Sequence, residues 1–292
     1  MVKPLPLPLN CVVGGYQIVR RLAEGGFGTV YLVVDPKGKQ YALKEYLPAS
    51  LVHRQVGQLT PQVRAGKSAL YQLGMKSFFE EGRALAQVHH PSVVQVQNFF
   101  QENGTVYMVM DYLHGNTLQD FILTARGLKK RYVFREATIH AIFDDLLSGL
   151  RFVHQKKMLH LDLKPSNVLL YNESTVSKIG DLGRSLCSSL KAPHDDGFSF
   201  TGQINYSPPE FLYGYIQQDW NQRVRSTDMY LFGSLITYYF FGMNMTALLL
   251  KHLDSRFRWT VYKGNFSEVK DYLIDAYFKS IDEIRISLGN KE

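Results

Sequence analysis

Short segments in which apolar and polar residues alternate run through the first part of the chain, and this pattern predicts β-strands. Glycine, asparagine, aspartate and proline, which are typical of turns, separate these segments. The predicted strands cover residues 16–23, 29–34, 40–45, 93–100 and 105–110. Before the fourth strand, apolar residues recur at helical spacing and predict one helix near residues 75–88.

From Leu118 onward the pattern becomes mostly helical. In its clearest stretch the apolar residues lie three or four positions apart, so they form one face of a helix. They are Ile139, Ile142, Phe143, Leu146, Leu147, Leu150 and Val153. A strand-rich part is therefore followed by a helix-rich part, with a link near residues 111–115. This order predicts an α+β fold.

One segment, residues 229–250, has no charged residue and is long enough to cross a bilayer as a helix. It also contains small and polar residues, among them Gly233, Ser234, Asn244 and Thr246. We favour a helix buried inside the protein and expect no membrane span, with a membrane helix as the alternative.

The composition is that of an ordinary globular protein, with 45% hydrophobic and 20% charged residues in 292. The net charge of +7 would suit acidic partners such as nucleotide phosphates, but we favour a solvated basic surface, and we expect no nucleic-acid partner. Only two cysteines occur, so we expect a cytoplasmic protein without a disulfide framework or structural zinc. Alternating Pro and Leu near the start predict an extended arm over residues 1–15.

The densest chemistry lies in the sequence His-Leu-Asp-Leu-Lys-Pro-Ser-Asn at 160–167, followed by Asp-Leu-Gly at 181–183. Asp162 is a candidate base, Lys164 is a cation for a phosphoryl group, and Asn167 and Asp181 offer the oxygen ligands that magnesium prefers. The order resembles the catalytic loop and metal-binding motif of Hanks-type serine/threonine protein kinases. The resemblance covers about residues 16–241. The chain is similar in organisation to stand-alone bacterial members of this group.

The resemblance implies a bilobal, α+β, protein-kinase-like fold. Residues 16–113 would form a small N-lobe with an antiparallel sheet and one regulatory helix, and residues 114–292 a mainly helical C-lobe, diverged after about 242. The N-lobe carries more residues than usual before its helix, so we expect an insertion at about 46–74. Two interpretations of the insertion stay open, namely a surface loop and a regulatory or docking element.

The glycine-rich turn before Lys44 resembles the phosphate-covering loop of the family, in which glycines let backbone amides approach phosphates. Ala23 stands where the family has its first glycine, and Lys44 matches the lysine that holds the α- and β-phosphates. The residues implied to bind the nucleotide are Ala23, Gly25, Gly26, Phe27, Gly28, Val30, Ala42, Lys44, Met110, Asp111 and Leu113.

The family pairs this lysine with a glutamate on the regulatory helix. The spacing from His90-Pro91 points to Glu81, while the adjacent Glu80 stays an alternative. On a helix the two side chains point about 100° apart, so only one of them can face Lys44. The implied catalytic set is therefore Lys44, Glu81, Asp162 and Lys164.

Two departures from the family bear on regulation. Leu161 stands where many kinases have an arginine that binds a phosphate on the activation segment, so we expect activity without such a phosphate. The segment would run over 181–210 and close with Ser-Pro-Pro-Glu, a variant of the family's Ala-Pro-Glu. After residue 242 we find no match to the arginine that usually pairs with its glutamate, here Glu210.

The predicted activity is transfer of the γ-phosphate of ATP to protein hydroxyls, including the chain's own. The implied cofactors are ATP and Mg²⁺, with Mn²⁺ as an alternative ion. A pseudokinase scaffold is one alternative, but the presence of Lys44, Asp162, Asn167 and Asp181 argues against it. A small-molecule kinase of similar fold is another, against which the Ser-Pro-Pro-Glu sequence favours protein substrates.

Overall fold

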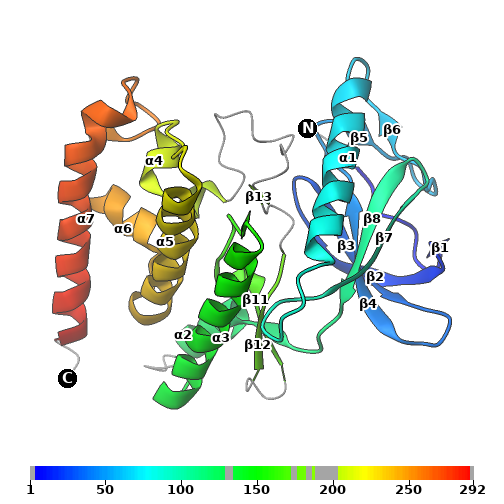
Figure 1. The fold of residues 1–292 in the computed structure, drawn as a ribbon, viewed down its shortest axis with the longest axis horizontal. Helices are drawn as coiled ribbons and strands as arrows, with labels where there is room; N and C mark the ends of the chain where they lie inside the picture. Colours follow the sequence, from blue (N-terminus) through cyan, green and yellow to red (C-terminus); the bar gives the residue numbers. More distant parts are fainter. Residues whose placement is uncertain (1–3, 129–133, 172–175, 182–185, 188–202, 290–292) are drawn as a thin grey trace. The chain divides into compact units, whose positions relative to one another are not determined.

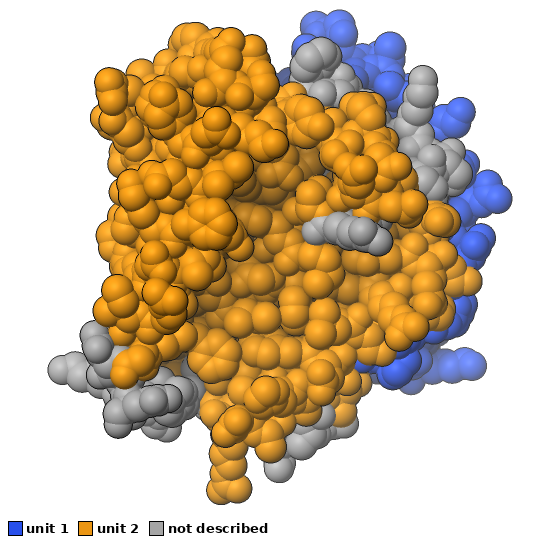
Figure 2. Space-filling view, turned by 60° about the vertical axis from the view of Figure 1, so that its left-hand side comes forward, with its two compact units in different colours: residues 1–114 blue, residues 115–292 orange. Residues whose placement is uncertain are grey.

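The computed structural model describes residues 4–128, 134–171, 176–181, 186–187 and 203–289. The chain divides into two compact units, residues 1–114 and residues 115–292 (Figure 2, blue and orange). The first unit is built on strands and the second mostly on helices, so the α+β prediction is confirmed (Figure 1).

The first unit contains a six-stranded antiparallel sheet in the order β1-β2-β3-β4-β8-β7. Turn residues and alternation produce the hairpins as predicted, with ends that shift by a few residues. The strands are β1 Val12–Val13, β2 Tyr16–Glu24, β3 Gly28–Val34, β4 Gln40–Tyr46, β7 Val96–Glu102 and β8 Thr105–Asp111. Because β1 pairs with β2, the end of the predicted arm already belongs to the sheet.

Helix α1, Ser68–Leu85, begins before the predicted start at residue 75 and ends three residues before the predicted end at residue 88. Its early turns pack on Tyr46, whose ring lies 5.6 Å from that of Tyr71. The contact is so close that a Cβ on Gly74 would lie 1.8 Å from the Tyr46 hydroxyl. Aromatic packing against the sheet thus extends the helix into residues that we had assigned to the insertion.

The predicted insertion at 46–74 is therefore not one loop. Residue 46 ends β4, and α1 takes the stretch from residue 68. The remaining residues carry a small hairpin, β5 Val52–His53 and β6 Gln62–Val63. Leu47, Leu51, Val52 and Arg54 are buried, so this stretch is attached to the body of the first unit.

The second unit is organised around a buried helix, α5 Trp220–Phe241, which packs with α3 Glu136–Gln155. Of the predicted apolar face of α3, five residues are buried, whereas Leu147 is exposed. The other helices are α2 Leu118–Gly127, α4 Pro209–Leu212, α6 Met245–His252 and α7 Phe266–Gly289. The short strands are β9 Asn116–Thr117, β10 Met158–Leu159, β11 Val168–Tyr171, β12 Val176–Ile179 and β13 Leu186–Cys187.

The uncharged segment at 229–250 is divided between α5 and α6. Gly242 ends α5 with a φ of 100°, and the Asn244 side chain caps α6 by accepting from the Ala247 amide. Among the described residues, no single helix is long and apolar enough to cross a membrane, although α5 and α6 together meet the length and composition criteria as a pair bent by 81°. Leu231, Leu235 and Leu248 are fully buried in the second unit.

Candidate active site

The register of the sheet places the predicted nucleotide-binding side chains on one face. Val30 lies opposite both Ala23 and Lys44, and Ala42 lies opposite Met110. Directly opposed residues in an antiparallel sheet point to the same side, and alternate residues of one strand do so as well. The five residues therefore form a continuous patch with Lys44 at its polar end.

Helix α1 covers part of this same face. A Cβ on Gly82 would lie 3.4 Å from the Cε of Met108, and Met108 is the cross-strand partner of Lys44. The neighbouring Glu80 accepts a hydrogen bond from Arg83 at 3.3 Å on the outer side of the helix. The helix thus turns Glu80 toward Arg83, and the choice of Glu81 as the partner of Lys44 stays a prediction.

The glycine-rich turn joins β2 to β3, and the Gly25 amide donates to the Gly28 carbonyl at 2.9 Å. Space around Gly25 and Gly26 is open, which suits close approach of a phosphate to the backbone. At Gly28 the reason for glycine is different, because a Cβ there would lie 2.0 Å from the Glu45 carbonyl oxygen. The close packing of Gly28 against β4 therefore requires a glycine at this position, independently of any ligand.

Strand β8 ends at Asp111, where the predicted link begins. The Asp111 amide donates to the Gln95 carbonyl at 3.0 Å, and its carboxylate accepts from the Gln97 side chain at 2.7 Å. That amide is therefore already bonded to the protein. The half-buried Leu113, two residues on, is the better candidate for a backbone amide that binds adenine.

In the second unit, Asp162 is 2% exposed and is held by hydrogen bonds from several directions. Its Oδ2 accepts from Lys164 Nζ at 2.8 Å and from the Asn167 side-chain amide at 3.2 Å. Its Oδ1 accepts from the Gln203 backbone amide at 3.0 Å. The structure thus brings the three predicted residues Asp162, Lys164 and Asn167 into direct contact.

The loop that carries Asp162 is fixed by Asp228, near the middle of α5. The Asp228 carboxylate accepts from the amides of His160 at 2.8 Å and Leu161 at 2.9 Å, and it pairs with His154 at 2.8 Å. Burial acts to raise the pKa of Asp228, but these hydrogen bonds and the neighbouring histidines hold it below its ordinary value. Leu161 has a φ of 62°, which is uncommon for a leucine, and the anchored amides maintain it.

The two predicted metal ligands lie at the same end of a hairpin. Val168 of β11 pairs with Ile179 of β12, so Asn167 and Asp181 flank that pair. The Gly180 amide donates to the Asn167 carbonyl at 2.8 Å, which brings the backbones of the two ligands together. The Asn167 side-chain amide donates to the Asp162 carbonyl at 2.7 Å, so its oxygen points elsewhere, and Asp181 is exposed with a φ of 50°.

Comparison with known proteins agrees with this geometry. The protein kinase domain family matches residues 16–257. The chain belongs to the protein kinase family. It is 31% identical to the serine/threonine-protein kinase Nek11 of Mus musculus over 70% of this chain and 29% of that protein. It is 26% identical to the probable serine/threonine-protein kinase pknA2 of Bifidobacterium longum over 84% of this chain and 30% of that protein.

The chain thus spans about a third of the length of these curated relatives. The solved structure described as the PpkA-294 apo form superposes with a TM-score of 0.64 at 27% identity, covering 84% of this chain and 83% of that one. The predicted family and the protein-kinase fold are confirmed. Protein kinase domains use ATP and a divalent metal ion.

The activation segment of this kinase domain is anchored at both ends. Met158 and Leu159 of β10 pair with Cys187 and Leu186 of β13 at its start. At its end Ser207 is fully buried, and its carbonyl accepts from Thr246 at 2.9 Å. Most of the segment lies outside the described residues. This includes Leu182, Gly183, Arg184, Ser185, Ser188, Ser189, Ser199, Thr201 and Gly202.

Sequence reasoning missed two groups that hold Asp162 and its loop in place. Gln203 acts through its backbone amide, which any residue other than proline provides, so no sequence signal marks it. Asp228 directly precedes the uncharged segment at 229–250, and a carboxylate at the edge of such a segment is a signal for a buried anchor.

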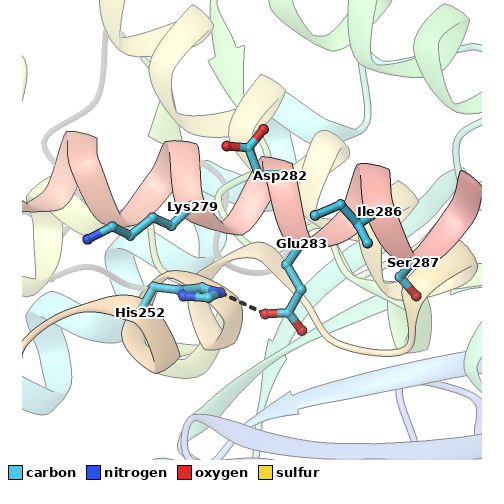
Figure 3. Close-up of a pocket in the computed structure, with 6 residues that line it drawn as sticks. All are labelled: His252, Lys279, Asp282, Glu283, Ile286 and Ser287. Atoms are coloured by element: carbon cyan, nitrogen blue, oxygen red, sulfur yellow. Dashed lines mark hydrogen bonds and ion pairs between the residues drawn. The ribbon is translucent and has the colours of Figure 1, made fainter.

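A groove on the surface between α6 and α7 contains none of the predicted site residues (Figure 3). His252 and Glu283 pair across it at 2.7 Å, and Lys251 donates to the same carboxylate at 2.6 Å. These bonds tie the two helices together, and we assign the groove a structural role.

Proposed function

We propose that this chain is an ATP-dependent serine/threonine protein kinase that transfers the γ-phosphate of Mg-ATP to hydroxyls of proteins, including its own. The arrangement of Asp162 carries the proposal. A buried carboxylate that contacts a lysine, an asparagine and a backbone amide is held in one geometry, as a group that orients a reacting hydroxyl must be. The curated relatives named above are serine/threonine-protein kinases or probable ones.

Each residue has a role that follows from its position. The Gln203 amide orients Asp162 Oδ1 by donating to it at 3.0 Å, and this carboxylate would accept the hydrogen bond of a substrate hydroxyl. Lys164, at 2.8 Å from that carboxylate, keeps a positive charge beside the hydroxyl and the incoming phosphoryl group. Lys44 would hold the α- and β-phosphates, and the apolar patch beside it would face adenine.

Asn167 and Asp181 would hold the ion. Hard oxygen donors suit Mg²⁺, which usually takes one or two protein ligands and completes its shell with phosphate oxygens and water. Among the residues that the structure describes, no group of three or more His, Cys, Asp or Glu could hold a metal by itself. A pair of protein ligands completed by the nucleotide fits that donor set. A bound divalent ion neutralises the charge that develops on the phosphates.

Protein substrates distinguish this proposal from a small-molecule kinase, and turnover distinguishes it from a pseudokinase. The direct test is incubation of the purified chain with labelled ATP, Mg²⁺ and a generic basic protein, beside Asp162→Ala. We expect labelled phosphoserine or phosphothreonine with the wild type and none with the variant. Tight ATP binding without transfer to any protein would instead support the scaffold alternative. A cytoplasmic location stays a prediction.

A further inference from the structure

Lys44 is followed by a carboxylate that lies on the other face of the same strand. Successive residues of a strand point to opposite faces, so Lys44 faces the side of α1 and Glu45 faces the opposite side. Glu45 is completely buried there, opposite Tyr107 of β8. A carboxylate without access to water must be compensated by nearby donors.

Three side chains compensate it. Arg54, from the stretch between β4 and α1, contacts both carboxylate oxygens of Glu45, with one bond of 3.1 Å, and its own side chain is fully buried. The hydroxyls of Tyr31 and Tyr107 donate to Glu45 at 2.9 and 3.1 Å. Burial, followed by the charge of Glu45, raises the pKa of both tyrosines, so both hydroxyls remain protonated donors.

The same cluster binds the N-terminal arm. The Arg54 guanidinium donates to the Leu5 carbonyl at 3.1 Å, and the Leu7 amide donates to the Tyr31 hydroxyl at 3.0 Å. The Leu7 side chain is 3% exposed and packs in the apolar core on this face of the sheet. Residues distant in sequence, from the arm, three strands and the 47–67 stretch, therefore meet at one buried charge.

Simple stabilisation explains such a cluster poorly. The cost of removing both charges from water offsets most of their attraction, and apolar residues of similar size often stabilise a protein as well or better. What a buried pair with fixed partners does provide is one defined arrangement. Here that arrangement fixes β4 at the position next to Lys44.

We propose that Arg54 and Glu45 are positioning residues for Lys44, and that the arm and the 47–67 stretch form a clasp on the back of the sheet that sets the affinity for ATP. This inference rests on the proposed role of Lys44 in binding ATP. Of the two interpretations of the insertion, this proposal corresponds to the regulatory element, because the clasp packs directly behind the position of Lys44 on β4.

The test compares the double variant Glu45→Gln/Arg54→Met with the wild type. Both charges are removed, and the introduced glutamine keeps a carbonyl oxygen for a tyrosine hydroxyl, so we expect the fold to be retained. We expect the KM for Mg-ATP to rise by about fivefold or more, with little change in the KM for the protein substrate. A wild-type KM for Mg-ATP in a folded double variant would overturn the proposal, because a purely structural cluster changes stability and not nucleotide affinity.

Two matched pairs add controls. Lys37→Met removes an exposed cation of the same unit that lies outside both the arm and the 47–67 stretch, and it should leave the KM for ATP unchanged. Leu7→Ala should raise that KM, whereas Leu9→Ala, at a side chain that is 63% exposed, should not. Equal effects within either pair would count against the clasp. Should the double variant not fold, the Leu7 and Leu9 pair still decides the question.

Lys44→Met in the same assays separates this inference from the proposed function. Loss of turnover in Lys44→Met together with normal ATP affinity in the clasp variants would refute only the clasp. Full turnover of Lys44→Met would refute the proposed nucleotide site, and with it the basis of the clasp.

Discussion

Asp162 and Asp181 are both carboxylates at the catalytic loop, but their surroundings give them different roles. Asp162 is buried among donors, whereas Asp181 is exposed beside Asn167 at the end of the β11–β12 hairpin. The first position suits orientation of a hydroxyl, and the second suits a metal ion that remains accessible to phosphate and water.

Substitution of each aspartate should therefore give a different pattern. We expect Asp162→Ala to lower turnover by about a thousandfold or more, with Mg-ATP affinity within about twofold of the wild type, because it loses positioning and not a ligand. Asp181→Ala should lower turnover and also weaken Mg-ATP binding by about tenfold. Calorimetry with and without Mg²⁺ measures the binding, and identical Mg-ATP affinity in wild type and Asp181→Ala would contradict the metal role.

Glu210 closes the activation segment, and burial raises its pKa from the ordinary 4.5 to about 7. Within the described residues it forms no ion pair, in agreement with the absence of the family's arginine from the sequence. The folded state therefore binds this proton more tightly than the unfolded chain does. Stability from this group is full below about pH 4.5 and is lost as the pH rises to about 7.

Glu210→Gln, which stays neutral, should remove this dependence. At about 1.4 kcal/mol for each pKa unit, the free energy of unfolding of the wild type should fall relative to the variant by up to about 3 kcal/mol between pH 4.5 and 8. Chemical denaturation at a series of pH values measures this difference. Parallel pH profiles for the two proteins would show that Glu210 titrates normally.

At the scale of elements, the sheet of the first unit presents two faces with different tasks. One face carries Lys44 and the apolar patch, and the other buries the Glu45 cluster under the N-terminal arm. The hairpin β2–β3 must approach β4 closely enough for this sheet to form. At that contact Gly28 leaves no room for a Cβ against the Glu45 carbonyl.

The glycines of this hairpin should therefore differ in their tolerance of alanine. Gly28→Ala should destabilise the fold by about 1–3 kcal/mol, because the added methyl group overlaps the β4 backbone. Gly26→Ala, in open space, should leave stability within about 0.5 kcal/mol of the wild type. Urea denaturation of both variants provides the comparison, and equal stability losses would indicate that the two glycines serve the same purpose.

For the whole molecule, the central question is whether the kinase requires phosphorylation of its activation segment. Leu161, at the position of the family's phosphate-binding arginine, is 3% exposed and packs inside the second unit. Its neighbours in the catalytic loop are fixed by Asp228 and Gln203 instead of by a phosphate. The loop therefore reaches its arrangement through internal contacts.

We expect activity without a phosphate on this segment. The Ser and Thr residues of 181–210 can be replaced by Ala, singly and together, and initial rates compared with the dephosphorylated wild type. Rates should remain within about threefold. A loss of about tenfold or more, or about 1.4 kcal/mol of transition-state stabilisation, that is restored by Asp would contradict the prediction. Ser207→Ala serves as a control for packing, since that side chain is fully buried.

Local patterns in the sequence were enough to predict the family, the order of strands and helices, and the residues of the catalytic loop. These follow from local signals, since turn residues and alternation produce hairpins and a few reactive residues at short spacing produce the loop. The predicted bounds of α1 were wrong because they depend on the packing of Tyr46 against Tyr71 and Gly74, which are distant from it in sequence.

The groups that hold the functional residues in place became visible in the folded chain. The anchoring of His160 and Leu161 by Asp228, the Gln203 amide on Asp162, and the meeting of Glu45 with Arg54 all join distant parts of the chain. Such contacts leave little trace in a sequence, because a backbone amide has no residue type and a buried charge is recognised only with its partners. Burial makes these bonds specific, and burial arises only when distant parts of the chain pack together.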